Sequence, residues 1–183
     1  MKRAFVLFLC AAALLGLVAC GGVPATREAV FKKLYRYLPE EVWGLIAEFK
    51  EGAAEGGGTQ YAWSETISTG GMSFTAQEIK YEFNERGLTY YSYAYFGVPP
   101  PERRAPLTAP KARKLAERFA RDFITGGEKM PLESAPEAST EIFCSDQVTF
   151  WQGGYAGKTY VIAVDPLYGH IVEVTSAPAP AAG

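Results

Sequence analysis

The sequence predicts an α+β fold of two similar units, each an amphipathic helix packed on an antiparallel β-meander. Apolar residues recur at helical spacing early in each half of the chain, and segments that alternate between apolar and polar residues follow. Each run of alternating segments ends in a polar turn closed by a glycine, Gly87 in the first half and Gly169 in the second. We therefore predict a degenerate internal duplication, with a first unit over 26–97, a linker over 98–109 and a second unit over 110–176.

The first half is predicted to contain one helix and three strands. Apolar residues at helical spacing follow Thr26, a typical N-cap residue, and Pro39 is expected to end the helix. Residues 41–50 fit either a short helix or a strand, and the meander that follows favours the strand. The glycine-rich stretch 51–59 is expected to be a loop. Strands are then predicted over 60–67, 74–83 and 88–96, with turns at 68–72 and 84–87.

The second half is predicted to repeat this order. A proline-rich linker leads to Pro110 at the start of a helix, whose unbroken apolar stripe runs to Ile124 and ends at two glycines. Strands are predicted over 142–151, 159–164 and 171–175, with turns at 153–157 and 165–169. The tail over 177–183 is rich in alanine and proline, and we expect it to be disordered.

The first 19 residues have the pattern of a secretory signal peptide. Two basic residues precede an unbroken apolar stretch, and small residues lead up to Cys20. A cysteine in this place resembles the signal of bacterial lipoproteins, whose mature chain begins at a cysteine that carries diacylglycerol. We therefore expect a tether over 20–25, fatty acylation of Cys20 (palmitate among the acyl chains), and a protein held on the extracytoplasmic face of the cell membrane. An uncleaved anchor and an ordinary signal peptide are the alternatives, because residues 4–23 are long enough to cross a bilayer.

Composition and cysteine count limit the partners and the cross-links. Without residues 1–19 the chain has 164 residues, of which 16 are basic and 20 acidic. A weakly acidic chain has no electrostatic attraction to nucleic acid, so no nucleic-acid partner is expected. Besides Cys20 only Cys144 is left, so an intramolecular disulfide is not expected. Cys144 stands in an apolar run without basic neighbours, which predicts a buried structural thiol.

The second half resembles the PepSY family, and the whole chain is similar to tandem PepSY-like envelope proteins. The resemblance rests on the helix at 111–119 and on the hairpin at 160–171, which is similar to the family's recurring V-x-V-D-x-x-x-G-x-I ending. The first half matches more loosely, through Trp63 and the turn at 84–87, where Asn84 replaces the expected aspartate. Family members occur as inhibitory propeptides of secreted metallopeptidases and as extracytoplasmic modules that restrain peptidases. The resemblance therefore implies a lipoprotein that binds or restrains an envelope peptidase.

The sequence contains no recognisable catalytic, metal-binding or cofactor-binding motif. The single histidine, His170, follows a turn glycine and is expected to be a turn residue. No spaced pair of histidines or cysteines suits zinc, and no nucleophile motif of a serine hydrolase occurs. Residues 153–159 end like a phosphate-binding loop, but Gln152 stands where its first glycine is required, and a strand follows instead of a helix. We therefore predict a non-enzymatic protein without catalytic residues, metal or cofactor; a glycosidase with two distant carboxylates stays open.

Two sets of side chains are candidates for a binding surface. Tyr91, Tyr93 and Tyr95 share one face of a predicted strand, and an exposed ladder of this kind would bind a glycan, peptidoglycan or an extended peptide. The alternative is that these tyrosines form cross-strand pairs over a core. The second set is the basic face of the second helix, either a solvated surface or one attracted to anionic lipid or wall polymer. Its members are Lys111, Arg113, Lys114, Arg118 and Arg121.

Overall fold

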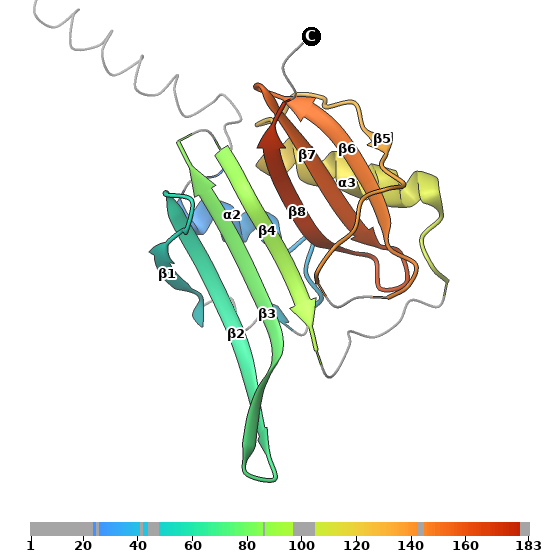
Figure 1. Ribbon diagram of the computed structural model, residues 1–183. Helices are drawn as coiled ribbons and strands as arrows, with labels where there is room; N and C mark the ends of the chain where they lie inside the picture. Colours follow the sequence, from blue (N-terminus) through green and yellow to red (C-terminus); the bar gives the residue numbers. More distant parts are fainter. Residues whose placement is uncertain are drawn as a thin grey trace, which may run out of the picture.

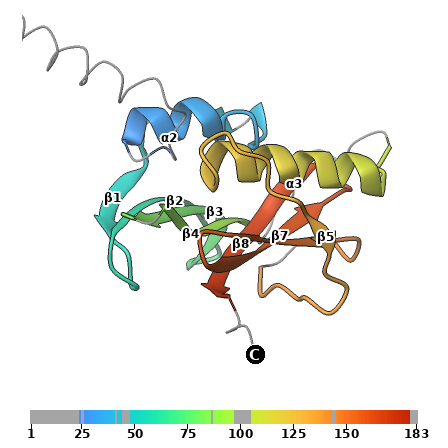
Figure 2. The same cartoon turned by 90° about the horizontal axis from the view of Figure 1, so that it is seen from above.

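The computed structural model describes residues 24, 26–40, 42–43, 48–85, 87–96, 105–142 and 145–179. Eight antiparallel strands form one sheet in the order β1-β2-β3-β4-β8-β7-β6-β5 (Figure 1). Helices α2 (Arg27–Leu34) and α3 (Ala109–Phe123) both lie on one face of this sheet (Figure 2). The strands are β1 (Lys50–Ala53), β2 (Thr59–Thr69), β3 (Met72–Asn84), β4 (Gly87–Tyr95), β5 (Glu133–Ser134), β6 (Thr149–Tyr155), β7 (Lys158–Asp165) and β8 (His170–Pro178).

The predicted division into two units, each a helix on its own meander, is wrong because the two halves share one sheet. The last strand of each half, β4 and β8, pair with one another, with Tyr91 opposite Val174. Helix α3 also contacts strands of both halves. It contacts β6 and β7 of its own half, while the Phe119 ring lies 5.0 Å from the ring of Tyr91 in β4. One hydrophobic core therefore lies between the two helices and the continuous sheet.

The predicted first helix is confirmed, but it is shorter than expected. The Thr26 side chain accepts a hydrogen bond from the Ala29 amide at 3.3 Å, as an N-cap does. The helix ends at Leu34, before Pro39, because the chain turns over residues 35–37 and brings Tyr37 onto α3.

The stretch between this helix and the second strand differs from prediction. The favoured strand over 41–50 is wrong for its described residues, since 40, 42–43 and 48 lie in short 3₁₀ turns and the strand begins only at Lys50. The expected loop over 51–59 is also partly wrong, because β1 pairs with residues 59–62 across a short turn. Positive φ angles at Gly57 and Gly58, 80° and 109°, make this turn tight enough for pairing.

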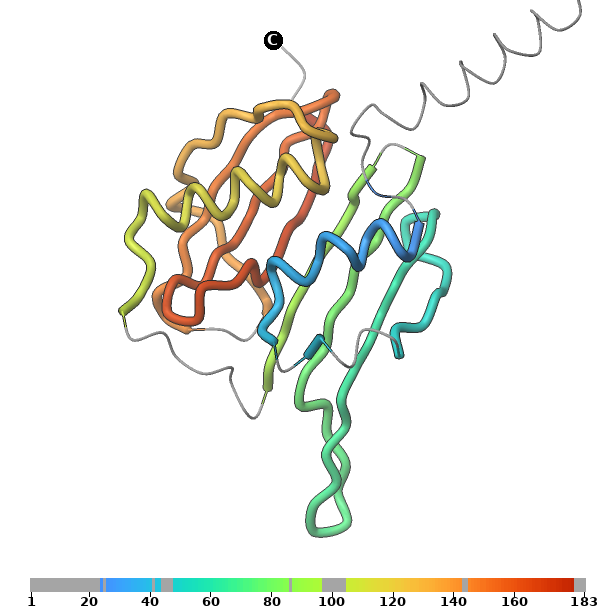
Figure 3. The backbone as a smooth tube through the Cα atoms, turned by 180° about the vertical axis from the view of Figure 1, so that it is seen from behind, coloured from blue at the N-terminus to red at the C-terminus, as the bar shows by residue number. Residues whose placement is uncertain are grey.

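The three predicted strands of the first meander are confirmed, and two of them are longer than expected. β2 and β3 continue to a two-residue turn at Gly70 and Gly71, whose φ angles of 58° and 81° suit the twist of a hairpin. Gly87 has a φ of 97°, as the predicted polar turn requires. The resulting β2–β3 ribbon extends beyond the rest of the sheet (Figure 3).

The second predicted helix is confirmed, with Pro110 in its first turn and a buried stripe of alanines and phenylalanines. The predicted strand over 142–151 is confirmed only for 149–151, because β6 begins at Thr149 and the described residues 142 and 145–148 are not in a strand. β6 also runs through the predicted turn at 153–157, so that the chain reverses at Ala156 and Gly157. β8 includes residues 177 and 178, which pair with Thr159 and Lys158 rather than starting a disordered tail.

Several predictions concern residues outside the described part of the chain. These are the signal peptide and lipid attachment at Cys20, the thiol of Cys144 and most of the linker. Among the described residues, neither helix has the length and the apolar character needed to cross a bilayer.

Candidate functional site

The predicted tyrosine ladder of β4 is buried. Tyr91, Tyr93 and Tyr95 are 0–2 % exposed, because they face the side of the sheet that the helices cover. Tyr91 packs against Phe119, and the ring of Tyr95 lies 5.3 Å from the ring of Tyr168. The three side chains therefore pack in the core, which corrects the expectation of an exposed ligand surface.

The three hydroxyl groups of this ladder differ in their partners. The Tyr93 hydroxyl donates to the Gln77 side-chain oxygen at 3.0 Å, and the Tyr95 hydroxyl donates to Asp165 at 2.9 Å. The Tyr91 hydroxyl is the one buried side-chain polar atom in the described part of the chain without a hydrogen-bond partner. Burial raises the pKa of Tyr91, so the group stays neutral at ordinary pH.

Asp165, the acidic residue of the V-x-V-D hairpin, is fully buried and joins three segments. Its Oδ2 accepts from the Tyr95 hydroxyl and from the Ser145 amide, each at 2.9 Å. Its Oδ1 accepts from the Ser145 hydroxyl at 2.8 Å and from the Leu167 amide at 3.0 Å. These bonds connect β4, the segment before β6 and the β7–β8 turn. A buried carboxylate satisfied in this way stabilises the fold and has no spare position for a substrate.

The residues considered for chemistry do not form a catalytic arrangement in the described parts of the chain. His170 is half-buried at the start of β8, and its ring lies 5.8 Å from the ring of Tyr93, edge to face. No group of three or more His, Cys, Asp or Glu side chains in the described ranges is suited to hold a metal ion. Residues 153–159 form the β6–β7 hairpin, which confirms the prediction that they are a hairpin and not a phosphate loop.

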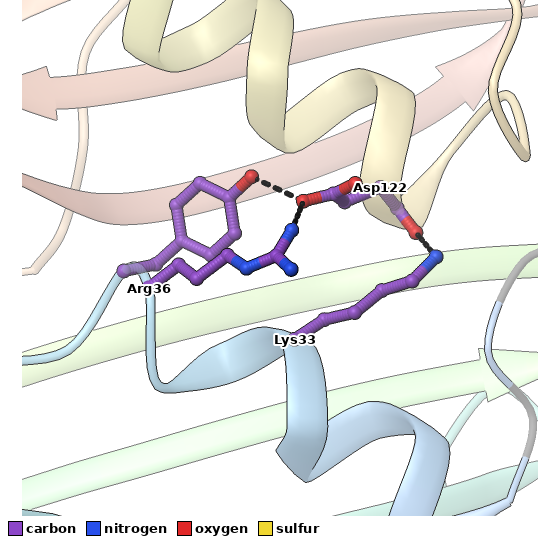
Figure 4. A network of polar contacts seen from close by, with 4 residues as sticks. Lys33, Arg36 and Asp122 are labelled. Carbon is purple, nitrogen blue, oxygen red and sulfur yellow. Dashed lines mark hydrogen bonds and ion pairs between the residues drawn. The ribbon is translucent and has the colours of Figure 1, made fainter.

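A polar network joins the C-terminal ends of the two helices (Figure 4). The Tyr37 hydroxyl donates to Asp122 Oδ2 at 2.7 Å, and Arg36 lies 3.6 Å from the same oxygen. The Lys33 ammonium donates to the Asp122 carbonyl at 2.9 Å. Burial and the hydrogen bond to Asp122 raise the pKa of Tyr37. The network fixes α2 against α3 and turns the Asp122 carboxylate toward the inter-helix contact.

The N-terminal segment is attached to the body immediately after the predicted lipid site. The buried Tyr81 hydroxyl donates to the Pro24 carbonyl at 3.2 Å, and Pro24 itself is buried. Only three residues separate Pro24 from Cys20 in the sequence, so the described body begins four residues after the cysteine.

The β2–β3 ribbon presents an apolar face that the sequence analysis did not identify. Ile67 pairs with Phe74, and Thr69 pairs with Met72, so these four side chains lie on the same face. Met72 is 70 % exposed and Phe74 is 43 % exposed. The opposite face carries hydroxyl side chains, among them Ser68 and Ser73, whose oxygens are 2.7 Å apart. Alternation of apolar and hydroxyl residues around Gly70 and Gly71 is the sequence signal that would have indicated this ribbon.

The outer edge of β2 is also available beside this face. β1 pairs only with residues 59–62, and no described strand pairs with β2 from 63 to 69 on that side. β3 likewise pairs with β4 only from Gln77 onward. Among the described residues, no strand covers the outer edge of β2 over 63–69 or of β3 over 72–76, although the Phe96 amide donates to the Ala76 carbonyl at 2.7 Å. An uncovered strand edge is the feature that strand addition uses.

The predicted basic face of α3 is exposed, and α2 adds to it. All five basic residues of α3 are exposed, as are Lys32 and Arg36.

Comparison with protein-family models, with curated proteins and with solved structures found no match for this chain.

Proposed function

We propose that this protein is a membrane-anchored extracytoplasmic lipoprotein without catalytic activity, which binds and regulates a protein of the cell envelope. The observation that supports it best is the hydrogen bond from Tyr81 to Pro24. It fixes the chain to the body four residues behind Cys20, which would leave only a short connection between the body and the proposed lipid anchor. The resemblance of the terminal hairpin to the PepSY family makes a peptidase the first candidate partner.

The β2–β3 ribbon is the binding element in this proposal. Exposed apolar side chains that gather on one face are typical of protein interfaces, and methionine adapts readily to a partner surface. The edge of β2 over 63–69, along which no described strand pairs, supplies main-chain donors and acceptors beside that face. A partner strand added at 63–69 would lie next to Ile67, and Met72 and Phe74 lie one strand further on the same face, where the body of the partner would contact them. The glycan alternative has no comparable support, because its three tyrosines are buried.

Photo-crosslinking in cells tests the binding element. A crosslinker replaces Met72 on the apolar face, or Ser73 on the hydroxyl face as the matched control. We expect Met72 to capture one extracytoplasmic protein and Ser73 to capture much less of it. The captured protein is then purified, and the full chain is expected to change its activity, a peptidase activity in the first instance.

Surface variants complete this test. Met72→Ser with Phe74→Ser is expected to abolish binding of the purified partner, whereas Ser68→Ala with Ser73→Ala is expected to leave it unchanged. Equal loss in both variants, or capture of lipid alone, would contradict the proposal. Mass spectrometry of the purified chain tests the anchor separately, since an unmodified Cys20 removes the lipoprotein part.

A further inference from the structure

We propose that the outer surfaces of α2 and α3 form one cationic layer that lies against anionic phospholipid headgroups. The layer would orient the anchored protein so that the other face of its sheet points away from the membrane. This inference rests on the proposed lipidation of Cys20, and it adds a second membrane contact made by the folded body.

The two helical segments concentrate positive charge. Residues 27–36 and 109–123 contain nine basic and three acidic residues. Seven of the basic residues are exposed, namely Lys32, Arg36, Lys111, Arg113, Lys114, Arg118 and Arg121. Two of the three acidic residues already have partners in the layer, since Glu117 bonds Arg113 at 3.0 Å and Asp122 bonds Tyr37. The layer therefore keeps a large excess of positive charge.

The rest of the chain has the opposite charge. Without residues 1–19, it contains seven basic and 17 acidic residues. On the sheet face away from the helices, strand register places Glu78, Glu82 and Glu173 together with Lys50 and Lys80, so these acidic side chains outnumber the basic ones. An anionic surface would attract the helix layer and repel this sheet face. Both effects favour the same orientation, so the charge distribution selects the face that contacts the membrane.

The position of the anchor supports the same face. Pro24 precedes α2 by two residues, and four peptide units connect it to Cys20. A chain of that length spans about 14 Å at most. The attachment therefore keeps the beginning of α2 close to the headgroups, within about two screening lengths at physiological salt.

The arrangement of the helices gives these charges a common surface. α2 and α3 lie on the same face of the sheet, and their C-terminal ends meet at Asp122 (Figure 2 and Figure 3). An acyl anchor combined with a basic patch is an effective pair of membrane signals, because each adds to the other. The occupant of this surface is thus the lipid headgroup layer next to the anchor.

The native lysines serve as probes in an experiment on the unmodified full chain. The protein is purified from membranes and placed in vesicles of phosphatidylcholine, or of phosphatidylcholine with phosphatidylglycerol. Its lysines are then modified with an amine reagent and mapped by mass spectrometry. We expect the reaction of Lys32, Lys111 and Lys114 to slow by about fivefold in the anionic vesicles. Lys50 and Lys80, which lie outside the helix layer, are the internal control and should react at unchanged rates.

A charge variant with a matched control completes the test. Lys111→Gln, Lys114→Gln and Arg118→Gln together should remove the protection of Lys32. Lys50→Gln, Lys80→Gln and Lys158→Gln together should preserve it. Unchanged labelling of Lys32, Lys111 and Lys114 in anionic vesicles would overturn the inference, as would equal protection in neutral vesicles or at high salt.

The same samples separate this inference from the proposed function. An unacylated Cys20 would end the lipoprotein proposal, yet protection of the helix lysines by added anionic vesicles would still support the cationic layer. An acylated Cys20 without such protection would be consistent with the lipoprotein proposal but would overturn the inference of a cationic layer on the membrane.

Discussion

Tyr91 and Tyr95 show how two identical side chains on one strand face differ in their energetic role. The Tyr95 hydroxyl is one of the donors that compensate the buried carboxylate of Asp165. The Tyr91 hydroxyl is buried without a partner, so its desolvation is not offset by a hydrogen bond. The aromatic ring of Tyr91 stabilises the core through Phe119, while its oxygen does not.

Removal of these two hydroxyl groups is therefore expected to have different effects. Tyr91→Phe should leave the free energy of unfolding unchanged or raise it by about 1 kcal/mol. Tyr95→Phe should lower it by about 1–3 kcal/mol, because Asp165 stays buried with one donor fewer. Urea denaturation of the two variants measures the difference. An equal loss in both would show that the Tyr91 hydroxyl has a stabilising partner.

At the scale of elements, β6 must pass closely beneath the chain that follows α3. A Cβ atom at Gly153 would lie 2.6 Å from the Pro131 carbonyl oxygen and 2.9 Å from a methyl carbon of Leu132. At the neighbouring Gly154 the nearest atom would be 3.8 Å away, an ordinary contact. The glycine at 153 thus allows the segment 130–132 to pack on the sheet.

Alanine substitutions at these adjacent positions test this close approach. Gly153→Ala should lower the free energy of unfolding by about 1–3 kcal/mol, because the backbone at Pro131 has to move. Gly154→Ala should have little effect, or stabilise the strand slightly, because alanine loses less conformational freedom on folding. Thermal unfolding followed by circular dichroism compares the two variants. Equal stability of both would mean that the 130–132 segment moves without cost.

At the scale of the whole molecule, the sheet and α3 make the two halves interdependent. β4 pairs with β8, and the rings of Phe119 and Phe123 pack on Tyr91 and Tyr81 of the first half. Neither half would keep this apolar surface buried if the other unfolded. The chain should therefore unfold as one cooperative unit.

Two fluorescent probes can show this cooperativity. Variants that keep only Trp63 or only Trp151 report on the first and the second half. Both are expected to give the same denaturation midpoint. Phe119→Ala should lower the free energy of unfolding reported by both probes equally, by about 3–5 kcal/mol. Phe74→Ala, in the exposed ribbon, is the matched control and should shift neither. Different midpoints for the two probes would favour independent units.

Prediction from sequence succeeded where local pattern decides the structure. The apolar stripe of α3, the N-cap at Thr26 and the glycine of the 84–87 turn are all confirmed. It was wrong at 145–148, because Ser145 is hydrogen-bonded to Asp165, 20 residues further along the chain, and the strand begins only at Thr149. It left both an exposed and a core position open for the β4 tyrosines, because period-two alternation marks two faces without showing which face a distant helix covers.

The two candidate surfaces also differ in how much of each could be predicted from the sequence. The basic face of α3 could be recognised by counting charges along a helix, but its union with α2 depends on both helices lying on one side of the sheet. The ribbon face that carries Met72 and Phe74 is exposed because β1 and β4 pair only with the other parts of β2 and β3.

The sequence by itself determined the helices, most of the strands and turns and the segregation of charge; its lipoprotein-like signal stays a prediction. Only the tertiary structure decided that the strands form one sheet, which side of that sheet is covered and which aromatic residues are inside. The physical reason is that hydrophobic periodicity and turn chemistry act over a few residues, whereas the pairing of β4 with β8 and the placement of α3 join residues about 30 to 80 positions apart.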